Sequence, residues 1–230
     1  MNCSKVAVTL AFAVSAILPG TRAFAEDFAT ANDAPKWNVY DFNRPAGKLR
    51  SGPPRALAVR GTGFDFSFTA ETALIGTSHP GYRGDLLGDL STRTVSARVG
   101  ITVTPGTVFS YSGQTDACGN KPAVRFFFRT NTSGDFRETD YWWSDPVSID
   151  IAGLASGERS MTVSFDPQNW SDFYGHFGND PAYADAFNAA VRDVQFIGLS
   201  FGGGCFFQNG VGIEPGSGSG IFRVLSFIVN

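Results

Sequence analysis

Residues 161–207 have the sequence MTVSFDPQNWSDFYGHFGNDPAYADAFNAAVRDVQFIGLSFGGGCFF. Apolar and small polar residues alternate over residues 161–165, which is the period-2 pattern of a half-buried β-strand. The same alternation returns over residues 197–201, and the glycine run at 202–204 ends that second strand. This stretch therefore predicts two strands separated by a longer connection.

The connection between these strands carries a helix start signal. Asp180 offers an N-cap oxygen, and Pro181 suits the first helical position because its missing N–H costs nothing there. Apolar side chains then recur at helical spacing at Tyr183, Phe187, Ala190, Val191 and Val194. We expect a helix over residues 181–193 that packs one face on a sheet.

Further alternating runs are distributed along the chain. They occupy residues 37–42, 64–69, 94–103, 124–129, 147–151 and 222–229. Clusters of Gly, Pro, Asn and Asp lie between them and indicate turns. Many short strands with one helix are typical of an all-β fold, and we expect a two-sheet antiparallel β-sandwich with one short helix. The polar side of residues 94–103 predicts a sheet face open to water.

The N-terminal residues have the pattern of a secretory signal peptide. A basic residue precedes an apolar run at 6–18, and the Ala-Phe-Ala motif at 23–25 has the small-x-small form of a cleavage site. We expect cleavage near Ala25 and export to the periplasm or the extracellular space. The predicted organisation is a signal peptide at 1–25, a flexible N-terminus at 26–35 and a single domain at 36–230.

The charge balance argues against two classes of partner. The chain has 18 basic and 21 acidic residues, and loss of residues 1–25 removes Lys5 and Arg22 but no acid. An acidic chain without a basic run does not favour nucleic acid or an anionic membrane surface. No second apolar run of about 20 residues follows the predicted signal peptide, so we expect no membrane insertion.

Two cysteines remain after removal of the segment that holds Cys3. Cys118 and Cys205 lie in glycine-containing loops of an exported chain, and we expect them to form a disulfide in an oxidising compartment. Two unpaired buried thiols are the alternative. The cysteines and histidines are scattered without the spacing of a zinc site, so the sequence predicts no metal and no cofactor.

Four short motifs occur in a suggestive order. They are Trp37-x-Val39, GDLLGDLS at 84–91, the alternating run at 95–103 and VQFIGL at 194–199. The series resembles the laminin IV (laminin B) domains and their secreted bacterial relatives, which are jelly rolls similar to galactose-binding-like domains and many carbohydrate-binding modules. The resemblance implies a jelly-roll fold and an extracellular binding or matrix module, and it implies no catalysis. The chain departs from the family at 201–205, where FGGGC replaces a Gly/Asp-rich ending.

Aromatic side chains gather in or beside the predicted loops. Sugars have apolar C–H faces and hydroxyl rims, so they are bound by flat rings beside amide and guanidinium donors. The candidate ligand-binding residues are Trp143, Trp170, Tyr174, His176, Arg125, Arg129, Phe207, Gln208 and Asn209. The alternative is that the rings belong to the core. Trp142 and Trp143 are neighbours in a strand and point to opposite faces, so we expect at least one of them to be a core residue.

Two patterns suggest catalysis, and the context supports neither. Residues 198–202 match G-x-S-x-G, but no helix pattern follows and both histidines of the chain precede Ser200. Asp140, Asp145 and Asp150 flank the paired tryptophans as glycosidase carboxylates would, yet aspartates are common at solvated turns. We therefore interpret Ser200 as a strand residue and expect no enzyme activity.

Three functions follow as hypotheses. The first is a secreted, non-catalytic module that binds a carbohydrate, a cell surface or a matrix component. The second is a structural or adhesive extracellular protein of the same fold without a small-molecule ligand. The third is an exported hydrolase or lyase, which would require Ser200 or a carboxylate pair to act as the catalytic group.

Overall fold

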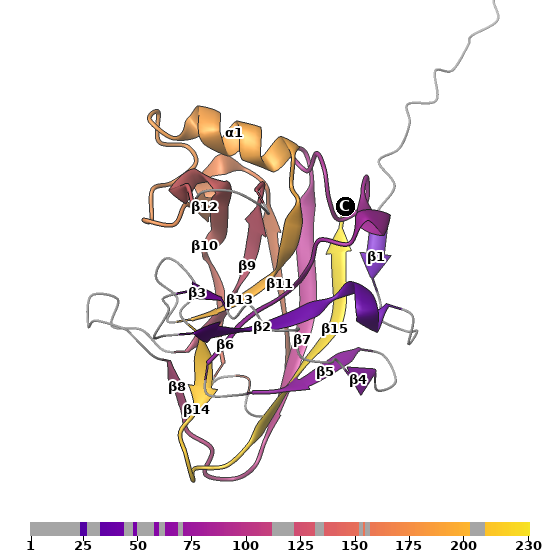
Figure 1. Ribbon diagram of the computed structural model, residues 1–230, viewed down its shortest axis with the longest axis vertical. Helices are drawn as coiled ribbons and strands as arrows, with labels where there is room; N and C mark the ends of the chain where they lie inside the picture. Colours follow the sequence, from indigo (N-terminus) through magenta and orange to yellow (C-terminus); the bar gives the residue numbers. More distant parts are fainter. Residues whose placement is uncertain are drawn as a thin grey trace, which may run out of the picture.

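Two antiparallel β-sheets pack face to face in the computed structural model (Figure 1). The structure describes residues 24–26, 33–43, 48–49, 58–59, 63–68, 71–111, 122–131, 136–151, 154, 157–202 and 210–230. Sheet I contains, in spatial order, β11 (Glu158–Ser164), β7 (Thr94–Val103), β15 (Gly220–Val229), β5 (Phe64–Ser67) and β4 (Ala58–Val59), and β1 (Phe24–Glu26) pairs with β15.

Sheet II is the larger of the two sheets. It contains, in spatial order, β12 (Trp170–Ser171), β10 (Tyr141–Asp150), β9 (Ala123–Arg129), β13 (Phe196–Gly202), β6 (Thr72–Thr77), β14 (Val211–Ile213) and β8 (Phe109–Tyr111). In addition, β2 (Asn38–Asn43) pairs with β6 and with β3 (Lys48–Leu49). Short 3₁₀ helices connect the strands at η1 (Ala34–Lys36), η3 (Pro80–Tyr82), η5 (Glu138–Asp140) and η7 (Pro167–Asn169).

The order of the eight principal strands is that of a jelly roll. Along the chain they are β5, β6, β7, β9, β10, β11, β13 and β15. Sheet I places the first, eighth, third and sixth of them side by side, and sheet II places the second, seventh, fourth and fifth. Two Greek keys wrapped on each other produce this order. The predicted all-β, two-sheet antiparallel jelly-roll β-sandwich with one short helix is therefore confirmed.

The inward faces of the two sheets form one continuous core. In β7, Val95 and Val99 are buried while Arg98 on the opposite face is exposed, as the alternation predicted. Rings from the two sheets meet across the interior, where Phe66 of β5 and Phe201 of β13 have centroids 5.9 Å apart. Burial of such rings supplies most of the favourable free energy of folding.

The helix α1 (Ala184–Arg192) begins later than the sequence predicted. The side chain of Asp180 accepts a hydrogen bond from the backbone N–H of Ala182 at 2.9 Å, so its capping oxygen holds a turn at 181–183 ahead of the helix. Phe187 and Val191 face the core. As Figure 1 shows, α1 lies beside β12 and β10 at one end of the sandwich.

The described structure begins ahead of the predicted domain start at residue 36. The strand β1 pairs with the end of β15, and Glu26 is buried there and accepts a hydrogen bond from the Tyr82 hydroxyl. The segment predicted to be a flexible N-terminus at 26–35 thus contributes Glu26 to sheet I. Residues 1–23 of the predicted signal peptide lie outside the described residues. Among the residues that the structure describes, none forms a helix that could span a membrane.

Candidate functional site

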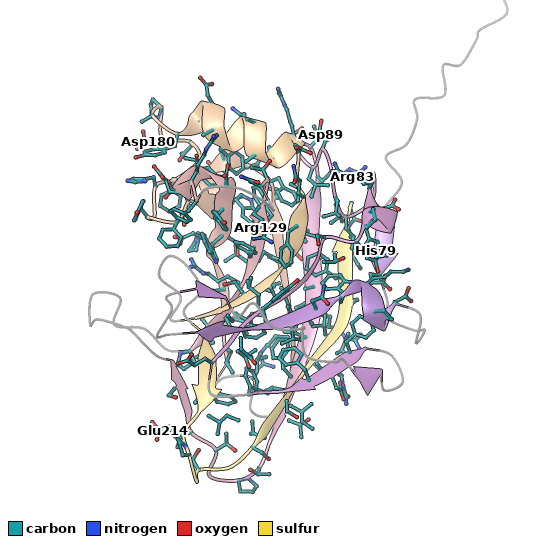
Figure 2. All side chains as sticks on the ribbon, viewed as in Figure 1. His79, Arg83, Asp89, Arg129, Asp180 and Glu214 are labelled. Carbon is teal, nitrogen blue, oxygen red and sulfur yellow. The ribbon has the colours of Figure 1, made fainter. Side chains whose placement is uncertain are left out.

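Six ring-bearing side chains form a continuous surface at the end of the sandwich that carries α1. We call them the aromatic edge cluster: Phe136, Tyr141, Phe173, Tyr174, His176 and Tyr183. They come from the segment before β10, from the start of β10, and from the loop and turn that join β12 to α1. Phe136 and Tyr174 are the most open, with 52% and 56% of their surface exposed. The cluster lies near Asp180, which Figure 2 labels beside α1.

Each ring of the cluster touches the next. Tyr141 stacks on Phe136 at 5.4 Å between centroids, and Phe136 meets Phe173 edge-on at 4.8 Å. Phe173 contacts Tyr174 at 5.2 Å, and Tyr174 lies 6.4 Å from the ring of His176. Edge-to-face and offset contacts of this kind stabilise ring pairs by about 0.5–1.5 kcal/mol beyond the area that they bury. The cluster is therefore a packed surface of defined shape.

A buried carboxylate holds the loop that carries the cluster. Asp172 is fully buried, and its Oδ1 accepts hydrogen bonds from the backbone N–H groups of Tyr174 and His176, both at 2.9 Å. The backbone N–H of Asp172 in turn donates to the carbonyl of His176 at 2.9 Å. Gly175 has φ +88°, a left-handed conformation that favours glycine and closes the turn. These bonds fix the exposed ring of Tyr174 on the surface.

The imidazole of His176 joins this carboxylate to a phenol. Its Nδ1 lies 3.0 Å from Asp172 Oδ2, and its Nε2 lies 3.3 Å from the hydroxyl of Tyr183, whose ring stacks on it at 4.1 Å. Desolvation, followed by the negative charges of Asp172 and Asp180, raises the pKa of Tyr183. Its hydroxyl is therefore protonated at neutral pH. The cluster presents a phenol and an imidazole as hydrogen-bonding groups beside its apolar rings.

We expect Asp172→Ala to lower the free energy of unfolding by about 1–3 kcal/mol, because two backbone N–H groups lose their buried acceptor. Asp172→Asn keeps an oxygen for both N–H groups and should cost less. Urea denaturation measures both free energies, and amide hydrogen exchange of Tyr174 and His176 reports on the loop. Equal stability and equal amide protection in Asp172→Ala and the wild type would contradict this role for Asp172.

The structure corrects the predicted exposure of Trp143 and Trp170. Both side chains have 0% of their surface exposed, so neither ring can stack on a sugar in this conformation. Trp170 lies parallel to Phe165 at 5.0 Å and donates from Nε1 to the carbonyl of Ser164 at 2.9 Å. Trp142 and Trp143 do point to opposite faces, as predicted, but both faces are buried at this point of sheet II.

Trp143 nevertheless packs against the buried side of the aromatic edge cluster. It lies on the face of sheet II that points away from the main core, in an apolar group with Leu74, Phe127 and Phe196. Its ring is nearly parallel to that of Tyr141, with 6.5 Å between centroids. Trp143 therefore acts on the exposed rings by positioning them.

The two predicted arginines lie on that same face of sheet II. Arg125 has 4% of its surface exposed, and burial lowers its pKa to about 10. Its Nη1 lies 3.5 Å from the carbonyl of Ser144 and 3.9 Å from Asp145 Oδ2. Arg129 is half-buried and lies opposite Tyr141 in the pairing of β9 with β10. Arg129 is thus next to the cluster, and Arg125 is four residues further along the strand.

The predicted site residues are therefore brought together only in part. Tyr174 and His176 belong to the aromatic edge cluster, and Arg129 borders it. Trp143 is buried under the cluster, whereas Trp170 is buried in the main core on the other face of sheet II. Phe207, Gln208 and Asn209 lie outside the described residues, as do Cys118 and Cys205 of the predicted disulfide.

The residues considered for catalysis have structural surroundings. Ser200 lies in the middle of β13, paired with Leu74 and Arg125 on the two sides, and its Oγ accepts from Trp143 Nε1 at 3.0 Å. It is a strand residue, as predicted, without the strand-to-helix turn of a nucleophile elbow. Asp145 lies 3.2 Å from the hydroxyl of Ser171, Asp140 ends η5 and Asp150 ends β10. The described part of the chain contains no group of three residues able to hold a metal ion.

Sequence reasoning missed Phe136 and Phe173 as surface residues and assigned Tyr183 to the buried stripe of the helix. Phe136 is an isolated aromatic residue in a polar connection. This pattern could have identified it as a candidate surface residue, because a solvated loop does not require a large ring. Tyr183 lies in the turn before α1, where helical spacing does not decide its direction.

Comparisons with known proteins assign neither a family nor a function to this chain. A scan against protein-family models finds no match, and a search of curated proteins finds no similar sequence.

Proposed function

We propose that this protein is an exported, non-catalytic binding module that holds a glycan on the aromatic edge cluster. The observation that carries the proposal is the exposure of Phe136 and Tyr174 on a packed row of rings whose loop is fixed by a buried carboxylate. Exposed rings held in one geometry cost little entropy on binding, and a sugar ring offers them an apolar face. The phenol of Tyr183 and the imidazole of His176 supply polar contacts for hydroxyl groups.

Two features of the sequence support this proposal. The signal-peptide pattern at 1–25 favours export to a compartment where polysaccharides are available. The resemblance to laminin IV domains and to galactose-binding-like jelly rolls favours a binding or matrix role, and we propose a relationship to them. A jelly roll alone does not imply any ligand, so the argument depends on the cluster.

We expect Tyr174→Ala and Phe136→Ala each to weaken glycan binding about tenfold, because each removes a stacking surface that contributes about 1–1.5 kcal/mol. A glycan array with the purified protein identifies the ligand, and titration calorimetry measures the affinities. Val108→Ala is the matched control, because it truncates an apolar side chain that is 46% exposed. The backbone carbonyl of Val108 accepts a hydrogen bond from the backbone N–H of Glu214, which Figure 2 labels at the far end of the molecule.

Binding that survives both substitutions would place the ligand elsewhere and refute the cluster as the site. Each substitution also removes two ring contacts, so the free energy of unfolding should fall by about 1–3 kcal/mol while the core remains folded.

A second candidate is a structural or adhesive extracellular protein. The observation that favours it is the complete burial of Trp143 and Trp170, which makes the two largest rings of the predicted platform part of the folded framework. Self-association, or adhesion to cell-wall material that free sugars do not compete away, would support this function over glycan recognition.

A further inference from the structure

The imidazole of His176 has one of its two nitrogens fixed by a buried carboxylate. Asp172 has none of its surface exposed, and its Oδ2 lies 3.0 Å from His176 Nδ1. Its other oxygen, Oδ1, accepts hydrogen bonds from two backbone N–H groups. An ionised carboxylate only accepts hydrogen bonds, so the hydrogen between the two side chains belongs to Nδ1. In the neutral imidazole, Nε2 then carries no hydrogen and acts as an acceptor.

The lone pair of Nε2 is available to a ligand. The Tyr183 hydroxyl lies 3.3 Å from Nε2, but the two rings are stacked, with 4.1 Å between centroids and 8° between planes. The phenol oxygen lies in the plane of its own ring, so it sits over the imidazole and not in the imidazole plane, where the lone pair lies. The His176 side chain is 39% exposed. Its Nδ1 edge faces Asp172 and one of its faces lies under Tyr183, so the exposed part includes the edge that carries Nε2.

Carboxylates are the charged groups that act on the neighbouring phenol. Desolvation, followed by the negative charges of Asp172, Asp180 and Glu138, raises the pKa of Tyr183. The same charges disfavour a second anion at this place. A ligand therefore meets a protonated phenol and an acceptor nitrogen, in surroundings that suit an uncharged group.

We propose that His176 is the specificity-determining residue of the site, and that its Nε2 accepts a hydrogen bond from a hydroxyl group of a neutral glycan. This inference rests on the proposed function and adds the class of sugar. Ethers, carboxylates and sulfates have no hydrogen to donate, so their oxygens would face the lone pair of Nε2 without a bond. The site takes an unsubstituted neutral sugar and rejects one that is methylated, oxidised or sulfated at the contacted position.

The tautomer of His176 can be measured without a ligand. The chain has two histidines, and the second one has the opposite arrangement: Nδ1 of the exposed His79 accepts from the backbone N–H of Gly81 at 3.1 Å, which leaves the hydrogen on Nε2. Nitrogen NMR spectra at about pH 8.5, where imidazoles are generally uncharged, should show an Nδ1–H ring for His176 and an Nε2–H ring for His79. The variant His79→Asn assigns the two signals. An Nε2–H form of His176 would overturn the inference, whichever glycan binds.

Asp172→Asn reverses the polarity of Nε2 while every ring stays in place. The new amide keeps its oxygen toward the backbone N–H groups of Tyr174 and His176 and turns its NH₂ group toward Nδ1. Nδ1 must then accept, so the hydrogen moves to Nε2, which becomes a donor. We expect this variant to gain affinity for sugars whose hydroxyls are methylated, and damage to the fold does not produce a gain.

The binding test uses neutral oligosaccharides of glucose, xylose, mannose and galactose, each beside its O-methylated form, which keeps the sugar rings and lacks the hydroxyl hydrogens. We expect the wild type to bind at least one free oligosaccharide about 5- to 100-fold more tightly than its methylated form, the range for an acceptor left without a donor. Asp172→Asn should lose most of this preference. His79→Asn is the matched control: Figure 2 labels His79 far from Asp180, and both affinities should remain unchanged.

The outcomes separate the inference from the function on which it rests. Equal binding of free and methylated sugars by the wild type, or a preference that persists in Asp172→Asn, would overturn the acceptor role of His176 even where Tyr174→Ala still weakens both ligands. A wild type that binds acidic or sulfated oligosaccharides and none of the neutral ones would overturn the sugar class alone. If the wild type binds no glycan, the proposed function and the inference both fail.

Discussion

Trp170→Ala is expected to lower the free energy of unfolding by about 3–5 kcal/mol, the range for deletion of a fully buried large aromatic ring. The ring lies parallel to Phe165 at 5.0 Å and meets Phe128 edge-on at 4.9 Å, so its removal leaves a cavity between β12 and the core. The substitution also removes the donor to the carbonyl of Ser164. Because Trp170 lies in β12, which leads directly into the loop of Asp172, the aromatic edge cluster should lose its order in the same variant.

Chemical denaturation followed by circular dichroism measures this loss. Tyr174→Ala is the matched control, since it removes a nearby aromatic ring that is 56% exposed, leaves no buried cavity and should therefore lose less stability than Trp170→Ala. A Trp170→Ala protein as stable as Tyr174→Ala would show that Trp170 does not belong to the core.

Gly198→Ala should lower the free energy of unfolding by a comparable amount, because it adds a methyl group where no space is available instead of leaving a cavity. A Cβ at this position would lie 2.0 Å from the carbonyl oxygen of Ile75 and 2.5 Å from the Cα of Gly76, both backbone atoms of the neighbouring β6. No side-chain rotation relieves a clash with backbone, so β13 and β6 must separate at the centre of sheet II. We expect a loss of about 3 kcal/mol or more, at the upper end of overpacking costs, or failure to fold.

The yield of soluble protein and the midpoint of urea unfolding measure the effect of Gly198→Ala. Gly157→Ala is the control, because a Cβ there would meet only the end of the Arg159 side chain at 3.7 Å, an ordinary contact. A Gly198→Ala protein with the stability of Gly157→Ala would mean that the two strands are further apart than described.

The regular strands were predictable because alternation in a sequence reports directly on which side of a strand is buried. The run at 94–103 shows this, since it became β7 with Val95 and Val99 inside and Arg98 outside. The helix was predictable from its apolar spacing, but its start was not, because Asp180 capped a turn before α1. The strand β1 was missed, since it is only three residues long and overlaps the predicted cleavage motif at 23–25.

The candidate site was predicted only in outline. The loop of Tyr174 and His176 was identified because aromatics between turn-forming residues are unusual in a solvated connection. Its rings could not be sorted into exposed and buried ones, since Trp143 and Trp170 have the same local sequence signals as Tyr174. The role of Phe136 depends on contacts with Tyr141 and Phe173, which are made across elements.

The all-β class, the alternation of each long strand, the helix and the loop rich in rings could all be derived from the amino-acid sequence, because each depends on spacing along the chain. Three features became visible only in the folded protein: the covering of the outer face of sheet II, the buried position from which Asp172 fixes the loop, and the place of Arg129 opposite Tyr141. Burial and pairing across strands depend on which segments become neighbours. In a jelly roll those neighbours come from distant parts of the chain, so local pattern carries no information about them.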